Sequence, residues 1–218
     1  MPFIIESQPR CTYQDELEAK EAEQVRQLLG NRSVDQFLQL PWDDRERIYN
    51  EALIAPHFLL MLWHEVQHGC LGAGVLLRQR HVTGSNQVAQ EANQIYYSRN
   101  SFHVSAPFLC ELLARQTDWE ADPDGGFDPK EWVQRISVIL YWDDITECGN
   151  PGENRRVVLE VLELLSQCPR LEDVTLEITG EDAADVREIE NILLAKQQTI
   201  WNLDRQVARG VRIVREHS

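Results

Sequence analysis

A helix gives way to a strand within the stretch Gln87-Val-Ala-Gln-Glu-Ala-Asn-Gln-Ile-Tyr-Tyr-Ser-Arg-Asn-Ser-Phe-His-Val104. In its first half, apolar side chains recur at helical spacing, on one face of a helix that Asn86 would cap. These apolar residues are Val88, Ala92, Ile95 and Tyr96. After Asn100, apolar Phe102 and Val104 alternate with polar residues, which is the pattern of a half-buried strand. The stretch therefore predicts a helix-to-strand corner inside a core.

Length and charge limit the possible classes of protein. The 218 residues suit one mixed domain or two small ones that share a core. The formal net charge of -15 repels phosphate backbones, and no basic stripe with interleaved aromatic residues offsets it. We therefore expect no binding to nucleic acid or to membranes. The longest apolar run, Phe58 to Trp63, is too short to cross a bilayer.

The cysteines and the N-terminus indicate a cellular compartment. The odd number of cysteines and the lack of a Cys-x-x-Cys pair are typical of reduced thiols. The cysteines are Cys11, Cys70, Cys110, Cys148 and Cys168. The opening residues, Met-Pro-Phe-Ile-Ile-Glu, lack the basic region and apolar run of a signal peptide. These features predict an intracellular protein of the cytoplasm or nucleus.

The chain divides into three parts by its residue patterns. Residues 1–32 are expected to be a tail followed by a solvated helix, Asp15 to Leu29, which Gly30-Asn31 ends. Residues 33–116 are expected to form a helical region. An acidic, glycine-rich segment then precedes a change of pattern.

Residues 130–218 are predicted to form a small α/β portion. The expected elements are a strand at 136–142, a helix at 155–167, a strand at 171–179, a long helix at 182–207 and a last strand at 211–214. A strand–helix–strand unit predicts parallel strands with a right-handed crossover. The fold class is therefore α+β, with a helical N-terminal region packed on this α/β portion.

Two segments resemble a family of fungal F-box-like domain proteins. The first is Phe37-Leu-Gln-Leu-Pro-Trp-Asp-Asp-Arg-Glu-Arg-Ile-Tyr-Asn-Glu-Ala-Leu53, which is similar to the family's Leu-Pro-x-x-x-Arg-x-x-Ile-Tyr opening. The second, Asn86 to His103, is similar to the family's Glu-Ala-x-x-x-Tyr-x-x-Asn-x-Phe segment. The resemblance covers roughly residues 33–115. Downstream, Leu164 to Leu176 resembles the leucine-rich-repeat units that often follow F-boxes.

The resemblance implies a function as an adaptor. Its helices would dock, by an apolar contact with a polar rim, on a Skp-family linker of a cullin ubiquitin ligase. Its C-terminal part would hold an unknown substrate protein. The docking positions that the resemblance implies are Leu40, Pro41, Ile48, Tyr49 and Leu53. The alternative is that the same residues pack the protein's own core.

A second hypothesis is a zinc-dependent metallopeptidase. The segment His64-Glu65-Val-Gln-His68 matches His-Glu-x-x-His, whose two imidazoles reach one zinc ion from one helix face. Glu65 would act as general base, and Glu91 on the predicted helix would be the third ligand. The apolar run before the motif favours a buried helix there. The alternative is that both histidines are ordinary helix-end side chains, in a protein without a cofactor.

Overall fold

The computed structural model describes residues 12–55, 59–61, 76–77, 86–113, 127–141, 151–180 and 183–217. Within these ranges, helices combine with a parallel sheet, as the predicted α+β class requires. In the same ranges, no helix is long and apolar enough to span a membrane.

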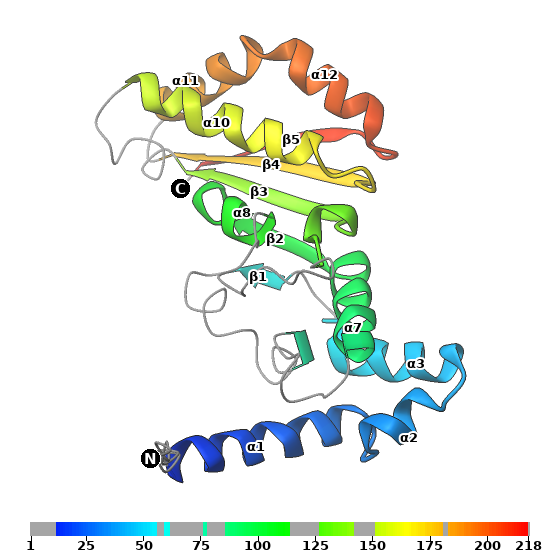
Figure 1. Ribbon diagram of the computed structural model, residues 1–218. Helices are drawn as coiled ribbons and strands as arrows, with labels where there is room; N and C mark the ends of the chain where they lie inside the picture. The colour runs from blue at the N-terminus through cyan, green and yellow to red at the C-terminus, as the bar shows by residue number, and fades with distance from the viewer. Residues whose placement is uncertain are drawn as a thin grey trace, which may run out of the picture.

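Helices make one end of the part of the molecule that is described, which we call the helical end (Figure 1). They are α1 (Thr12–Leu28), α2 (Val34–Leu38), α3 (Trp42–Leu53) and α7 (Asn86–Arg99). Gly30 and Asn31 follow α1 with positive φ angles of 70° and 60°, so the expected helix end is confirmed. Ser33 caps α2 through a capping box: its hydroxyl accepts from the Gln36 amide, and the Gln36 side chain accepts from the Ser33 amide.

The helix-to-strand corner is confirmed. The apolar face predicted for α7 is buried, with every one of its four side chains less than a twentieth exposed. Strand β2 (Ser101–Ser105) follows directly, and Phe102 and Val104 are fully buried while their neighbours are half-buried. Asn100 holds the turn, because its side chain donates to the carbonyls of Tyr96 and Leu53 and accepts from the Ala55 amide.

Among the described residues, the sheet has five strands in chain order, and every neighbouring pair is parallel. The other strands are β1 (Leu59–Met61), β3 (Arg135–Tyr141), β4 (Asp173–Gly180) and β5 (Val211–His217). The predicted parallel pairing of the two strands around the helix at 155–167 is confirmed as β3 and β4. Strand β2 also pairs with β3. The sheet therefore extends into the region 33–116, which was expected to be helical.

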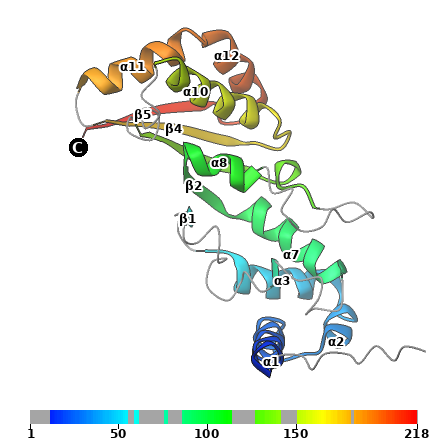
Figure 2. The ribbon, with the colours of Figure 1, turned by 60° about the vertical axis from the view of Figure 1, so that its left-hand side comes forward.

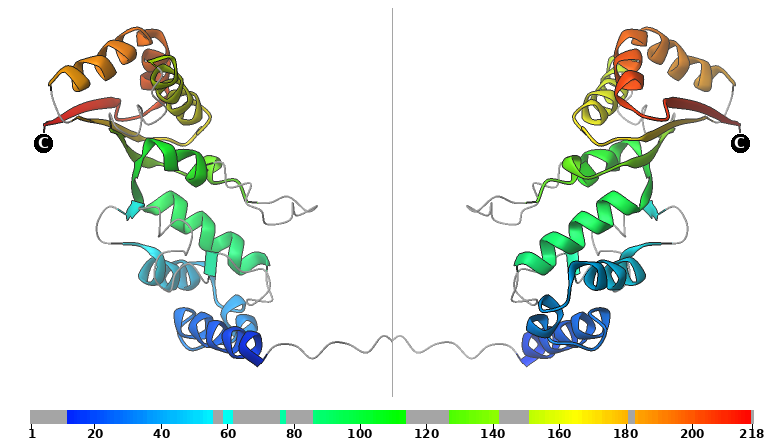
Figure 3. Two further views of the ribbon diagram at one scale, coloured as in Figure 1. Left: turned by 90° about the vertical axis from the view of Figure 1, so that its left-hand side faces the viewer. Right: turned by 90° about the vertical axis from the view of Figure 1, so that its right-hand side faces the viewer.

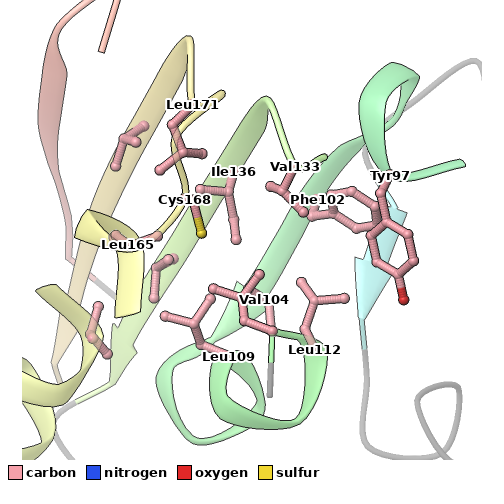
Figure 4. Close-up of a cluster of buried hydrophobic side chains, with 14 of the residues drawn as sticks. Tyr97, Phe102, Val104, Leu109, Leu112, Val133, Ile136, Leu165, Cys168 and Leu171 are labelled. Atoms are coloured by element: carbon pink, nitrogen blue, oxygen red, sulfur yellow. The ribbon is translucent and has the colours of Figure 1, made fainter. Parts of the chain in front are cut away.

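One layer of helices covers one face of this sheet (Figure 2). The layer consists of α8 (Ala106–Leu113), α10 (Pro151–Ser166), α11 (Ala183–Leu194) and α12 (Gln197–Gln206), and a short 3-10 helix (Pro129–Glu131) precedes β3. Helix α10 contacts both α8 and α12, so the helices lie side by side. In Figure 4, Val104 of β2 lies close to Leu109 and Leu112 of α8 in the core between the two layers. We call this part the sheet end; Figure 3 shows it at the top and the helical end below.

Two predicted elements differ from the structure. Residues 59–61 were expected in a buried helix, but they form β1, paired with β2. A continuous apolar run fits a buried parallel strand as well as a helix, so periodicity does not separate the two. The helix expected at 182–207 is divided at Ala195–Lys196 into α11 and α12. Helix α11 packs on β4, whereas α12 contacts α10 and β5.

Candidate partner-binding surfaces

The two family-like segments meet through Arg45 of α3 and Glu91 of α7. Arg45 Nε donates to Glu91 Oε2 at 3.0 Å, and Arg45 Nη2 donates to Glu91 Oε1 at 2.8 Å. Only 11% and 13% of the two side chains are exposed, so solvent screens this bidentate pair weakly. The hydrogen bond to Glu91 raises the pKa of Arg45 above its already high value, and the guanidinium stays charged. This hydrogen-bonded ion pair thus joins α3 to α7 in one defined geometry.

Tyr49 completes this contact. Its hydroxyl donates to Glu91 Oε2 at 3.1 Å, and its ring packs edge-on against Phe37 at 5.1 Å between ring centroids. Burial, with a smaller contribution from Glu91, raises the pKa of Tyr49 well above its ordinary value. We call Arg45, Tyr49 and Glu91 the clasp.

The predicted docking positions divide between the core and the surface. Tyr49 and Leu53 are buried, so these two side chains pack the protein's own core, which was the alternative reading. Leu40 and Ile48 are half-buried, and Pro41 is exposed. The neighbouring Trp42 is 37% exposed and lies 5.5 Å from the Arg45 guanidinium.

Arg45 also fixes the backbone of this surface. Its Nη1 donates to the Leu40 carbonyl at 2.7 Å and to the Leu38 carbonyl at 3.4 Å. The connection between α2 and α3 is therefore tied to the clasp. We call Leu40, Pro41 and Trp42 the apolar corner.

The zinc hypothesis depends on residues that lie mostly outside the described ones. His64, Glu65 and His68 are among these, so their arrangement is not tested. Glu91 is described, and its two oxygens accept hydrogen bonds from Arg45, Tyr49 and Gln87. A metal bound to Glu91 would compete with these donors. Within the described residues, no group of three His, Cys, Asp or Glu side chains is placed to hold a metal. Metal analysis of the protein and of a His64→Ala, His68→Ala variant tests the hypothesis.

The sheet face opposite the helix layer, which we call the open face, carries polar side chains. Glu177 of β4 lies near its centre and is 18% exposed. Ser137 of β3 donates to Glu177 Oε1 at 2.5 Å, and His103 Nδ1 of β2 lies 3.6 Å from the same oxygen. Glu177 Oε1 is thus the acceptor of the Ser137 hydroxyl, a position that the histidine holds in a hydrolytic triad.

Arginines gather where the strands of the open face begin. Asp173, the first residue of β4, accepts from Arg212 at 2.6 Å and lies 3.7 Å from Arg209. Arg135, the first residue of β3, pairs with Asp173 in the strand register. Its Nη2 donates to the carbonyl of Arg99. We call Arg135, Arg209 and Arg212 the arginine row.

Sequence reasoning did not identify either the clasp or the arginine row. The clasp joins residues 46 positions apart, and its only signal was that both belong to the family-like segments. The arginine row comes from the start of β3 and from the start of β5 with the segment before it, which the strand register brings to the same end of the sheet.

Comparison with known proteins does not add to this description. A scan against protein-family models found no matching family, and searches of curated proteins and of solved structures found no significantly similar protein.

Proposed function

We propose that this protein is a protein–protein interaction module that acts as a substrate adaptor of a cullin-type ubiquitin ligase. The helical end would dock on a Skp-family linker, and the open face of the sheet end would hold the substrate. The observation that carries the proposal is the apolar corner, which combines the exposed Pro41 and Trp42 with a backbone that Arg45 holds in place. A surface fixed before binding loses little conformational entropy when a partner arrives.

The arrangement of the two ends supports this division of roles. Helices α2 and α3 lie at one end of the molecule and strands β4 and β5 lie toward the other (Figure 1), so a partner on the apolar corner would leave the open face of these strands free. Trp42 is the large exposed aromatic side chain of the corner, and such residues dominate binding energy at interfaces. Ile48, half-buried on α3, would border the contact.

Calorimetric titration of the full chain with a Skp-family linker tests the proposal. Trp42→Ala is expected to weaken binding at least about tenfold, the usual effect of truncating a central aromatic anchor. The matched control is Trp201→Ala, because Trp201 is similarly exposed, at 45%, and lies on α12 at the sheet end beneath Arg205. This variant is expected to bind the linker like the unchanged protein.

Absence of linker binding to the unchanged chain would refute the adaptor function and leave a generic interaction module. Equal losses in both tryptophan variants would instead refute the apolar corner as the docking surface.

A further inference from the structure

Strand β5 forms one edge of the described sheet. It lies beyond β4 at the end of the strand order (Figure 2). Its Val211 amide points away from β4, because it donates to Asp204 Oδ1 of α12 at 2.8 Å. Backbone groups alternate in direction along a strand, so those of Ile213 and Arg215 also point outward. Asp204 thus satisfies the first outward amide, and among the described residues no strand lies beside the groups that follow.

Two neighbouring apolar side chains of β5 are exposed on opposite faces of the sheet. Ile213 pairs in the register with the fully buried Leu176, so it lies on the face that the helices cover, and it is 46% exposed. Val214 pairs with Glu177, so it lies on the open face, and it is 41% exposed. A partner on one face would cover only one of the two side chains. A strand added at the edge would lie beside both.

The features that usually keep a strand edge from pairing are weak in β5. Such features are short length, proline, bulges and free charges. The strand has seven residues without a proline, and its register with β4 is uninterrupted. Its arginines are engaged within the chain, because Arg212 donates to Asp173 and Arg215 forms an ion pair with Glu190 of α11. The edge is therefore suited to pairing with another strand.

We infer that two copies of this protein associate through β5, with the two strands antiparallel about a two-fold axis at Val214. An antiparallel pair closes into a symmetric dimer, whereas head-to-tail addition of parallel strands leaves a free edge at each end. The sheet of one copy then continues into the sheet of the other. This association is independent of the adaptor function.

The sequence of β5 is complementary to itself in this register. With Val214 on the axis, Arg212 of one copy falls opposite Glu216 of the other. Ile213 falls opposite Arg215, and the outward backbone groups of these two residues form hydrogen bonds across the axis. Opposite charges on facing residues stabilise a strand pair, whereas like charges destabilise it.

The neighbouring positions of the axis fit less well. An axis at Arg215 places two arginines directly opposite each other. An axis at Ile213 places Arg215 opposite Val211, whose amide is already bonded to Asp204. The charge pattern and the bonded amide therefore favour a second copy in a single register.

Disulfide cross-linking of Val214→Cys tests this register on the full chain. Facing residues of a non-hydrogen-bonded antiparallel pair have Cα atoms about 4.5 Å apart, which a disulfide can bridge. Mild oxidation is expected to convert most of this variant to a linked dimer, with twice the chain mass of 25.3 kDa. The matched control is Leu194→Cys, because Leu194 is 66% exposed but lies on α11 and not on β5. It should cross-link no more than the unchanged protein with its native cysteines.

Val214→Lys is the second variant, and it places two ammonium groups opposite each other at the axis. Its side chain can pair with the neighbouring Glu177 of its own copy, so the fold should be kept. Sedimentation velocity is expected to show single chains at concentrations where the unchanged protein has twice the chain mass. The amides of Ile213 and Arg215 should then exchange with solvent at least about tenfold faster than in the unchanged dimer.

Three results would overturn the inference. The first is an unchanged protein that sediments as a single chain, and slow exchange of the Ile213 and Arg215 amides in that chain would show that another of its own segments covers the edge. The second is equal cross-linking of Val214→Cys and Leu194→Cys. The third is a dimer that Val214→Lys leaves intact, which would place the interface elsewhere on the molecule.

Discussion

The helical end and the sheet end share one apolar core but differ in the polar contacts that join their elements. At the helical end, polar contacts between elements distant in sequence join α3 to α7, as Arg45, Tyr49 and Glu91 show. At the sheet end, a continuous apolar layer lies between the strands and α8, α10 and α11. Burial of apolar area is non-directional, whereas a hydrogen-bonded charge pair demands one geometry.

This difference indicates what each end does. The sheet end buries the face that its helices cover, so its open face can carry polar and charged side chains. At the helical end, the clasp adds a hydrogen-bonded ion pair to the apolar core and fixes the geometry of the apolar corner. The following predictions test this distinction by unfolding measurements.

The largest effect is expected from a cavity in the sheet end. Leu162 of α10 is fully buried in the core, so Leu162→Ala should lower the free energy of unfolding by about 2–5 kcal/mol. Leu194→Ala is the control, because that side chain on α11 is 66% exposed and should change stability by less than about 0.5 kcal/mol. Denaturant unfolding monitored by circular dichroism measures both. Similar values for the two leucines would contradict the apolar account of this end.

The next effect is expected from opening the clasp. Glu91→Ala leaves the Arg45 guanidinium and the Tyr49 hydroxyl without their acceptor, which should cost about 3 kcal/mol. The control is Glu160→Ala, since Glu160 pairs with Arg156 on the surface of α10, where such pairs contribute less than about 0.5 kcal/mol.

The location of the damage distinguishes the two ends. Hydrogen exchange in Glu91→Ala should accelerate in α3 and α7 more than in α10. Uniform acceleration would mean that the two ends unfold as one unit. The same variant is also expected to weaken linker binding, because Arg45 then no longer fixes the apolar corner.

Alkaline pH is expected to lower the stability of both ends, and the loss begins at a different pH for each end. Burial raises the pKa of the Cys168 thiol, at the sheet end, from 9.0 to about 12. The folded state therefore keeps a proton that the unfolded state releases. The resulting stability is fully present below pH 9 and is lost as pH rises toward 12, at about 1.4 kcal/mol per pH unit.

Burial also raises the pKa of Tyr49, at the helical end, so the stability that its proton contributes is likewise lost as pH rises. This loss begins above the ordinary tyrosine pKa of 10.0. Cys168→Ala should flatten the decline of stability from pH 9 upward, and Tyr49→Phe should flatten only the part above pH 10. Unfolding midpoints measured from pH 8 to 11 separate the two. If the unfolding midpoints of the two variants depended on pH in the same way, neither buried group would keep its proton above its ordinary pKa.

Sequence patterns predicted the parts of the fold that depend on local periodicity. The buried face of α7, the alternation in β2 and the parallel pair of β3 and β4 were all readable, because each rests on spacings within one element or one crossover. The β1 strand was not, since three apolar residues in a row do not distinguish strand from helix. The break between α11 and α12 was missed as well.

The candidate surfaces were less predictable than the fold. Tyr49 and Leu53 carried the expected pattern of docking residues, yet their burial depends on which face of α3 meets α7. The unpaired Nε of Arg135 depends on the positions of neighbouring acceptors, and residue patterns do not contain them.

The smallest effect is expected at the α2 cap. Ser33→Ala removes the hydroxyl that accepts from the Gln36 amide at 3.3 Å, and loss of such a cap costs about 1 kcal/mol. Because α2 has only five residues, most of that loss should fall on its own exchange rates and not on the sheet end. Ser33→Asp keeps an acceptor and places a negative charge at the helix N-terminus, so it should restore stability. Hydrogen exchange of α2 with denaturant unfolding measures both variants. If Ser33→Asp were as unstable as Ser33→Ala, the cap would not be what orders the residues that lead into the apolar corner.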